Sequence, residues 1–238
     1  MKSLLLSGLM ALAGVAGAAE PQLRIVLAGD STVTDKSGWG RAFAERLAPG
    51  VTCSNTAHGG ESTRSCLDSG RWAQAVALHP THVLIQFGHN DMPGKGPKRE
   101  TDPKTTYRAN LIRFVEDVRA TGAQPILVTS IPRRTFKDGK LVGELAPYVE
   151  AARAVASDKK VPLADLYKKS VEAIEKLGPE ASEELGPMGK DGKRDHTHLA
   201  KPGQELTAKL LVEELCRVVP DLAGAFRKEQ PAGEETAR

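Results

Sequence analysis

The sequence predicts an α/β fold, a three-layer αβα domain with a parallel sheet at its centre. Short apolar stretches alternate along the chain with longer amphipathic ones. The apolar stretches are nearly continuous hydrophobic runs, which is typical of parallel strands that are buried on both faces. The chain has 238 residues, 40% of them hydrophobic, which is enough for one sizeable core. We therefore predict a single domain.

Five strands are predicted, each from a short run rich in valine, isoleucine or leucine. They cover residues 23–28, 51–54, 81–87, 125–129 and 161–164. An insertion at residues 133–142, with Lys137-Asp138-Gly139-Lys140 at its centre, predicts a small hairpin beside the sheet. Because the carboxyl ends of parallel strands meet at one edge, we expect the functional site at that edge.

Amphipathic helices connect these strands. Residues 104–121 place five apolar side chains on one helical face, after an Asp102-Pro103 start signal: Tyr107, Leu111, Phe114, Val115 and Val118. Further helices are predicted over residues 145–157 and 166–177, and a last one follows Pro202.

The two ends of the chain differ in composition from the middle. Residues 1–19 combine an early Lys2, a short apolar run and the small residues Ala18 and Ala19, which is the pattern of a secretory signal peptide. We expect cleavage there, export to the periplasm or the medium, and a single folded domain over residues 20–220. Residues 221–238 are charged and poor in large apolar side chains, and we expect a disordered tail.

Charge excludes one class of function. The chain carries 33 Lys and Arg against 30 Asp and Glu, a net charge of +3, which argues against a nucleic-acid binder. Beyond the first 19 residues, no stretch is apolar enough to cross a membrane. The sequence leaves the oligomeric state open.

Three cysteines are too few for a disulfide scaffold. Export would permit one bridge, and Cys53 with Cys66 is the pair we expect; in the alternative, all three are small buried side chains. For Cys216, on an apolar helix face, we favour the second interpretation.

Ser31 is a candidate nucleophile. The first strand runs into Gly29-Asp30-Ser31-Thr32, so the hydroxyl group is expected at the edge of the sheet where sites form. In isolation, Ser31 in such a turn is more often a helix cap.

A nucleophilic serine needs a base and a group that orients the base. Asp195-His196-Thr197-His198 offers both, because Asp195 can turn back to accept from His198 while the other ring nitrogen faces Ser31. The alternative is a metal site, but no further Cys or His cluster completes a ligand set.

Two further loops are suited to stabilising an oxyanion. Residues 55–62, with Gly59-Gly60, follow the second strand, and Gly88-His89-Asn90-Asp91 follows the third. Each alone is equally an ordinary turn or cap. His58 and His89 flank these loops, and we expect them to hydrogen-bond within the loops rather than to contact a substrate.

Together these four segments resemble the four blocks of the SGNH (GDSL-like) hydrolases, most closely the rhamnogalacturonan acetylesterase branch, carbohydrate esterase family twelve. The match extends to Gly38-Trp39-Gly40 and to residues 133–136. The resemblance implies a flavodoxin-like fold, secretion, and removal of acetyl groups from pectin without a metal or cofactor. It further implies Ser31 as nucleophile, His198 as base, Asp195 as its partner, and an oxyanion hole formed by the Ser31 N–H, the Gly60 N–H and the Asn90 side chain.

Substrate recognition is less specific in the sequence. Arg64, Arg71, Arg133 and Arg134 lie in predicted edge loops and could pair with galacturonate carboxylates, or they could be ordinary solvated charges. Two other functions remain open: a lipolytic esterase, thioesterase or xylan acetylesterase of the same fold, and a non-catalytic carbohydrate-binding domain.

Overall fold

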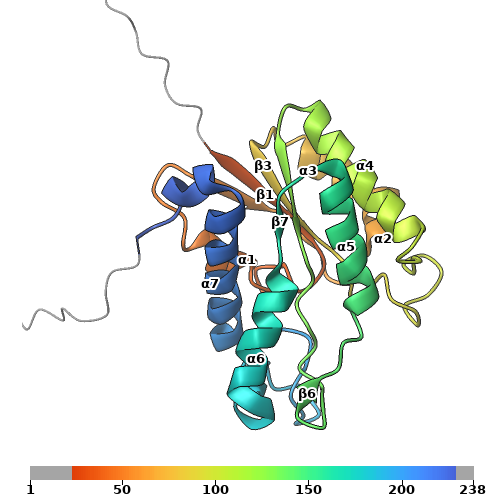
Figure 1. Ribbon diagram of the computed structural model, residues 1–238, viewed down its shortest axis with the longest axis vertical. Helices are drawn as coiled ribbons and strands as arrows, with labels where there is room; N and C mark the ends of the chain where they lie inside the picture. The colour runs from red at the N-terminus through yellow and green to blue at the C-terminus, as the bar shows by residue number, and fades with distance from the viewer. Residues whose placement is uncertain (1–22, 229–238) are drawn as a thin grey trace, which may run out of the picture.

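A five-stranded parallel sheet, in the order β2-β1-β3-β4-β7, forms the centre of the computed structural model (Figure 1). The structure describes residues 23–228, so the predicted signal peptide at residues 1–19 lies outside the described residues. The strands are β1 (Arg24–Gly29), β2 (Thr52–Asn55), β3 (His82–Gln86), β4 (Gln124–Val128) and β7 (Leu163–Ala164). This is the flavodoxin-like strand order, and the predicted parallel sheet is confirmed.

Both faces of the sheet are buried, as the continuous apolar strands predicted. In β1, Ile25 and Leu27 point into one hydrophobic cluster, whereas Val26 and Ala28 point into the other. The register of β1 with β3 pairs Leu27 with Leu84, and both belong to the first cluster. The alternation of side chains along each strand therefore divides one sheet into two cores.

Two groups of helices cover these cores (Figure 1). The first core is covered by α1 (Gly40–Ala44), α6 (Leu166–Glu183) and α7 (Lys201–Val218), and the second by α2 (Thr63–Asp68), α3 (Arg71–Val76), α4 (Thr106–Ala120) and α5 (Ala146–Lys159). The three-layer arrangement is thus confirmed. Helices α1, α2 and α3 were not predicted, since five or six residues are too few to show a helical period.

Residues 133–142 contain the predicted hairpin, with β5 (Phe136–Lys137) antiparallel to β6 (Lys140–Leu141). Helix α6 continues beyond the predicted end at residue 177. The chain breaks the helix at Gly178, where φ is 80°, and Pro179 then begins a second helical piece. The described residues contain no helix long and apolar enough to cross a membrane.

The predicted domain boundary at residue 220 is wrong. Pro220–Ala225 form the 3₁₀ helix η1, and Leu222, Ala225 and Phe226 are buried in the first core. Phe226 also bridges to Leu47, and the Arg227 N–H donates to the Arg46 carbonyl at 2.8 Å. A few apolar residues within a charged segment are enough to fix it against the core; the rest of the predicted tail, residues 229–238, lies outside the described residues.

The predicted disulfide is also wrong, because Cys53, Cys66 and Cys216 are all free thiols. Cys53 is paired with Ile25 in the sheet and packs against the first core, whereas Cys66 of α2 packs in the second. The sheet lies between the two sulfur atoms, and burial raises the pKa of the Cys53 thiol to about 12. The alternative interpretation, that all three are buried side chains, holds for Cys66, whereas Cys53 and Cys216 are only partly buried.

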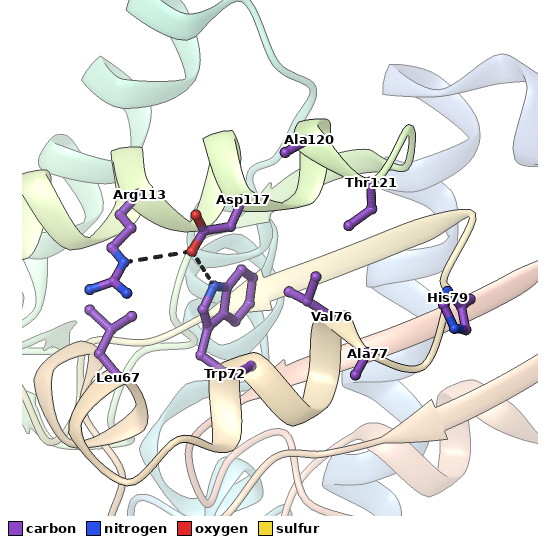
Figure 2. Close-up of a pocket in the computed structure, with 10 residues that line it drawn as sticks. Leu67, Trp72, Val76, Ala77, His79, Arg113, Asp117, Ala120 and Thr121 are labelled. Carbon is purple, nitrogen blue, oxygen red and sulfur yellow. Dashed lines mark hydrogen bonds and ion pairs between the residues drawn. The ribbon is translucent and has the colours of Figure 1, made fainter.

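A groove of about 480 Å³ lies between α3 and α4 (Figure 2). Trp72 forms its floor, with its indole N–H donating to Asp117 at 2.8 Å. His79 and Thr121, which precede β3 and β4, also line it. The groove is therefore at the amino end of the strands, opposite to the edge where the functional site was expected.

Candidate active site

The turn that carries the candidate nucleophile Ser31, called the nucleophile turn below, begins where β1 ends. Asp30 is fully buried, and its Oδ1 accepts hydrogen bonds from the Thr32 N–H at 2.9 Å and from the Thr32 hydroxyl at 2.7 Å. The Ser31 carbonyl accepts from the Thr34 and Ser37 hydroxyls. These bonds fix the backbone on both sides of Ser31, and the Ser31 side chain is left half-buried at the sheet edge.

Gly38 belongs to the Gly38-Trp39-Gly40 segment, to which the family resemblance extends, and the structure gives a reason for this glycine. A Cβ atom on Gly38 would lie 2.2 Å from the Thr32 carbonyl, so this close approach admits only glycine. The neighbouring Trp39 donates its backbone N–H to the same carbonyl at 3.0 Å. Gly38 and Trp39 therefore hold the backbone of Thr32, the residue after Ser31, in place.

His198 lies between Ser31 and Asp195. Its Nε2 is 2.9 Å from the Ser31 Oγ, and its Nδ1 is 2.6 Å from the Asp195 Oδ2. The other Asp195 oxygen accepts from the Thr197 and His198 N–H groups at 2.7 and 3.0 Å. Burial alone would raise the pKa of Asp195, but the hydrogen bonds from His198 and Thr197 lower it to about 2. An ionised Asp195 holds the proton on Nδ1 and leaves Nε2 free to accept from Ser31.

Arg134 holds the loop that carries Asp195 and His198. Its side chain is 4% exposed, and Nη2 donates to the carbonyls of Asp195 at 2.5 Å and His198 at 2.7 Å. The Arg134 N–H donates to the His196 carbonyl at 2.8 Å. Burial lowers the pKa of Arg134 to about 10, so the side chain stays charged near neutral pH.

The prediction that Arg134 contacts substrate is therefore wrong, since the guanidinium group is used inside the protein. A second contact secures the loop from the other side. The Leu199 N–H donates to the Ser37 carbonyl at 2.9 Å, which joins the histidine loop directly to the nucleophile turn. Both contacts are tertiary and leave no signal in the sequence.

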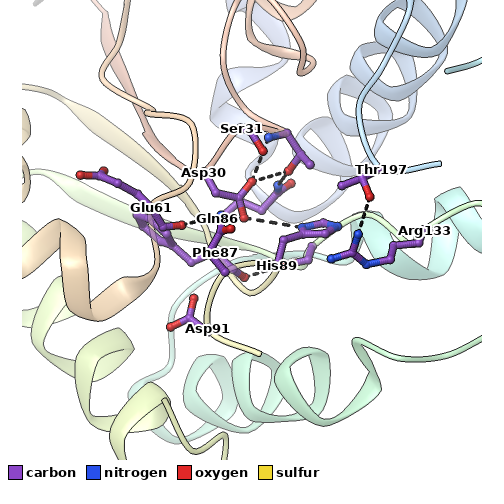
Figure 3. Close-up of polar contacts among 12 residues, drawn as sticks. Asp30, Ser31, Glu61, Gln86, Phe87, His89, Asp91, Arg133 and Thr197 are labelled. Atoms are coloured by element: carbon purple, nitrogen blue, oxygen red, sulfur yellow. Dashed lines mark hydrogen bonds and ion pairs between the residues drawn. The ribbon is translucent and has the colours of Figure 1, made fainter. Parts of the chain in front are cut away.

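The other predicted substrate-binding arginines are also engaged by the protein. Arg64 donates to the Pro97 carbonyl at 2.8 Å, and Arg71 pairs with Glu61 at 2.8 Å. Arg133 hydrogen-bonds to Thr197 (Figure 3). It also pairs with Glu144. Arg133 lies beside the histidine loop, as Arg134 does, but its side chain is 21% exposed rather than buried.

The predicted oxyanion donors converge near Ser31. The segment after β2 continues beside β1, with the His58 N–H donating to the Gly29 carbonyl at 3.0 Å. A Cβ atom on Gly59 would lie 4.0 Å from the Ser31 Cβ, and Gly60 has a φ of 81°, which favours glycine. Within residues 23–228, neither the Ser31 N–H nor the Gly60 N–H has an acceptor. Both donors therefore remain available.

Asn90 supplies a third donor. Its side chain is buried, and Nδ2 donates one hydrogen to the Glu61 carbonyl at 3.0 Å. An amide has two N–H groups, so this bond fixes its orientation and leaves the second N–H free. The Glu61 side chain is itself held by Arg71 and by Ser69.

A buried polar layer lies beneath these residues. Gln86 accepts from the Trp39 indole at 3.0 Å and donates to the Thr32 hydroxyl at 2.7 Å. His89 is 2% exposed, and its Nδ1 is 3.6 Å from the Asp30 Oδ2 (Figure 3). No partner within the described chain hydrogen-bonds to either His89 nitrogen, so the predicted hydrogen bonds of His89 within its loop are wrong. Gln86 was not singled out from the sequence, where it lies in an apolar strand.

Asp91 stabilises the loop after Asn90. Its Oδ1 accepts from the Thr63 N–H, the Thr63 hydroxyl and the Thr101 hydroxyl. Burial raises the pKa of Asp91 to about 7 against the effect of these hydrogen bonds. The hydrogen bonds of Asp91 thus go to Thr63 and Thr101. In the described part of the chain, no group of three or more His, Cys, Asp or Glu residues is arranged to hold a metal ion.

Comparison with known proteins places this chain in a family. Residues 18–206 match the model of the GDSL-like lipase/acylhydrolase family. The chain is 38% identical over 210 residues to the rhamnogalacturonan acetylesterase RhgT of Bacillus subtilis, an alignment that covers 80% of this chain and 88% of the relative. It is 32% identical to YesY of the same organism, described as a probable rhamnogalacturonan acetylesterase, over 87% of this chain and 98% of that one.

Solved structures share the fold. The B. subtilis protein YXIM_BACsu superposes with a TM-score of 0.72 at 27% identity, over 85% of this chain and 58% of that chain. A catalytic mutant of Axe2, an acetylxylan esterase from Geobacillus stearothermophilus, superposes with a TM-score of 0.61 at 18% identity, over 81% and 94%. At that identity the likeness to Axe2 concerns the fold alone.

Proposed function

Because this chain belongs to the GDSL-like lipase/acylhydrolase family and is a carboxylic ester hydrolase, we propose that it removes O-acetyl groups from pectin, most specifically rhamnogalacturonan. The observation that carries the proposal is the pair of contacts made by His198, at 2.9 Å to Ser31 and 2.6 Å to Asp195. The two relatives named as rhamnogalacturonan acetylesterases support the choice of polysaccharide.

The reaction proceeds in two steps. The Ser31 Oγ attacks the acetyl carbonyl carbon while His198 Nε2 takes its proton, and the tetrahedral intermediate collapses as His198 returns that proton to the departing sugar oxygen. Water then attacks the acetyl-serine ester, with His198 again as base. The second step releases acetate and restores the Ser31 hydroxyl.

The developing oxyanion is bound by three donors. They are the Ser31 N–H, the Gly60 N–H and the free N–H of Asn90, which the contact with Glu61 holds in place. Donors fixed in this way stabilise charge in the transition state, and removal of one typically costs about 3 kcal/mol. Asp195 remains ionised throughout and stabilises the imidazolium form of His198.

The surroundings of Ser31 favour a small acyl group. Its neighbours are glycines and polar side chains, and the apolar groove between α3 and α4 opens at the opposite end of the strands (Figure 2). A lipolytic esterase would require an apolar channel that leads to the nucleophile. Residues 1–19 would direct the enzyme out of the cell, where pectin is found.

Acetate release tests the proposal. We expect release from acetylated rhamnogalacturonan to exceed release from acetylated xylan and from a long-chain acyl ester, and to vanish in Ser31→Ala. A preference for xylan or for the long-chain ester would keep the nucleophile and refute the substrate. Equal release by the Ser31→Ala variant would refute the mechanism and favour a carbohydrate-binding role.

A further inference from the structure

Arg99 lies against the loop that carries the proposed oxyanion donor. Its Nη1 is 3.6 Å from the position that a Cβ atom on Gly60 would occupy. The preceding residue, Gly59, faces Ser31, with 4.0 Å between the corresponding Cβ positions. Gly59 and Gly60 are adjacent, with their Cα atoms about 3.8 Å apart. These two residues therefore lie between Ser31 and the guanidinium group of Arg99. A sugar bound at Ser31 therefore has Arg99 as a neighbour.

The Arg99 side chain is held near its base and available at its tip. Its backbone N–H donates to the Gly96 carbonyl at 2.9 Å, and its Nε donates to the Lys95 carbonyl at 2.9 Å. Among residues 23–228, its Nη groups have no acceptor, and no carboxylate lies within 4.0 Å of the guanidinium group. The side chain is half-buried. Its orientation is therefore set by the protein, while its Nη donors and its charge are unused.

The loop around Arg99 is anchored to the rest of the site. Arg64 donates to the Pro97 carbonyl at 2.8 Å, and the Glu100 carboxylate accepts the Gly96 N–H at 2.6 Å. The Thr101 N–H donates to the carbonyl of Asp91, next to Asn90, at 2.9 Å. Of these contacts, the one to Pro97 occupies the Nη1 group of Arg64.

The nearest acidic side chains are committed elsewhere. Glu61 follows Gly60, but its carboxylate pairs with Arg71 at 2.8 Å and its side chain is 8% exposed. Glu100 accepts from the Gly96 N–H. Within residues 23–228, neither of these carboxylates forms an ion pair with Arg99.

We infer that Arg99 recognises a carboxylate on the substrate, that of a uronic acid in the sugar chain from which acetyl is removed. The guanidinium group presents two adjacent Nη donors, which match the two oxygens of a carboxylate. The inference rests on the proposed function and adds to it the residue that selects acidic over neutral sugars. Arg99 orients the sugar and takes no part in proton transfer, so its effect belongs to KM rather than to kcat.

Three probes separate these roles. The first is a mono-O-acetylated methyl galacturonoside as its free acid, the second is the same compound with its carboxyl group methylated, and the third is 4-nitrophenyl acetate, which has no carboxylate. The variants are Arg99→Gln and Arg99→Lys, with Lys98→Gln as a matched control that removes an exposed charge from the same loop.

We expect the wild type to prefer the free acid over its methyl ester in kcat/KM. Arg99→Gln should lose about 10- to 100-fold on the free acid, mainly through KM, because a charge-assisted bidentate contact is lost. Activity on the methyl ester and on 4-nitrophenyl acetate should change less than about twofold, which also shows that the variant is folded. Arg99→Lys should recover part of the preference, and Lys98→Gln should keep it.

Other results would overturn the inference. If the wild type cleaves both galacturonosides equally, or if Arg99→Gln slows both equally, Arg99 does not recognise the carboxylate, while the proposed carbohydrate esterase activity stands. If the wild type cleaves 4-nitrophenyl acetate but neither galacturonoside, the proposed function fails and this inference fails with it.

Discussion

Replacement of Arg134 by methionine should both destabilise the protein and slow catalysis. Methionine fills much of the same volume but cannot donate the hydrogen bonds that Nη2 makes to the carbonyls of Asp195 and His198. Hydrogen bonds from a charged donor contribute about 1.5–3 kcal/mol each. The cost of burying the guanidinium group, which also lowers the pKa of Arg134, offsets part of this contribution.

We therefore expect the free energy of unfolding to fall by about 2–4 kcal/mol. For a domain of about 200 residues this corresponds to a decrease in Tm of roughly 5–15 °C. With the Asp195–His198 loop less well held, kcat on 4-nitrophenyl acetate should decrease by about 10- to 100-fold, because small misplacements of a base are costly. KM should change little, since the buried Arg134 does not reach substrate.

The neighbouring arginine supplies the control. Arg133→Met removes a side chain of the same type that is 21% exposed, pairs with Glu144 and contacts the same loop through one hydrogen bond, to the Thr197 side chain, so its cost should stay below about 1 kcal/mol. Thermal unfolding and steady-state kinetics of both variants test whether Arg134 positions the loop. If Arg134→Met loses no more stability than Arg133→Met and keeps the wild-type kcat, then Arg134 does not position the loop.

Three further predictions concern the site. Asp195→Asn should lower kcat by about 10⁴-fold, because the amide no longer holds the proton on Nδ1 of His198. A decrease in kcat of less than tenfold, measured by stopped-flow hydrolysis, would contradict the proposed mechanism. Asn90→Ala should lower kcat by about 10²–10³ with little change in KM, as expected for an oxyanion donor, and equal losses in binding and rate would assign Asn90 another role. Burial raises the pKa of Asp91 to about 7 from its usual 3.8, so the folded state binds the extra proton and stability should decrease as pH rises from about 4 through 7. Denaturant titrations should find a flatter dependence in Asp91→Asn, and an identical slope would mean that Asp91 does not titrate in this range.

The ionisation of Asp195 has the opposite sign. Its pKa is lowered to about 2, so the stability it contributes is fully present above pH 4 and is lost as the pH falls towards 2.

Much of the fold followed from local pattern. The predicted strands lie within a few residues of those in the structure, because a run such as Ile25 to Ala28 buries every side chain and needs no partner to be recognised. The short helices escaped prediction, since five or six residues do not show a period. The predicted domain end at residue 220 was wrong because it relied on the charged composition of the residues that follow. Their burial depends instead on the contact of Phe226 with Leu47 in the folded chain.

The sequence by itself singled out the side chains that we propose as the catalytic ones. Ser31, Asn90, Asp195 and His198 were singled out because a nucleophile, a base, an orienting group and an amide donor occur at the ends of predicted strands or before the last helix. Their order along the chain identifies the family. It does not give the distances, which depend on how the loops pack.

Tertiary structure alone decided what the arginines do. Residue type made Arg64, Arg71, Arg133 and Arg134 equivalent candidates for a substrate carboxylate, yet each has an acceptor supplied by another part of the folded chain. Arg99 has no such acceptor for its Nη groups within the described chain and lies beside Gly60. A guanidinium group forms its hydrogen bonds with whichever acceptor the fold places within about 3 Å, so its role is a property of the packed chain rather than of the sequence around it.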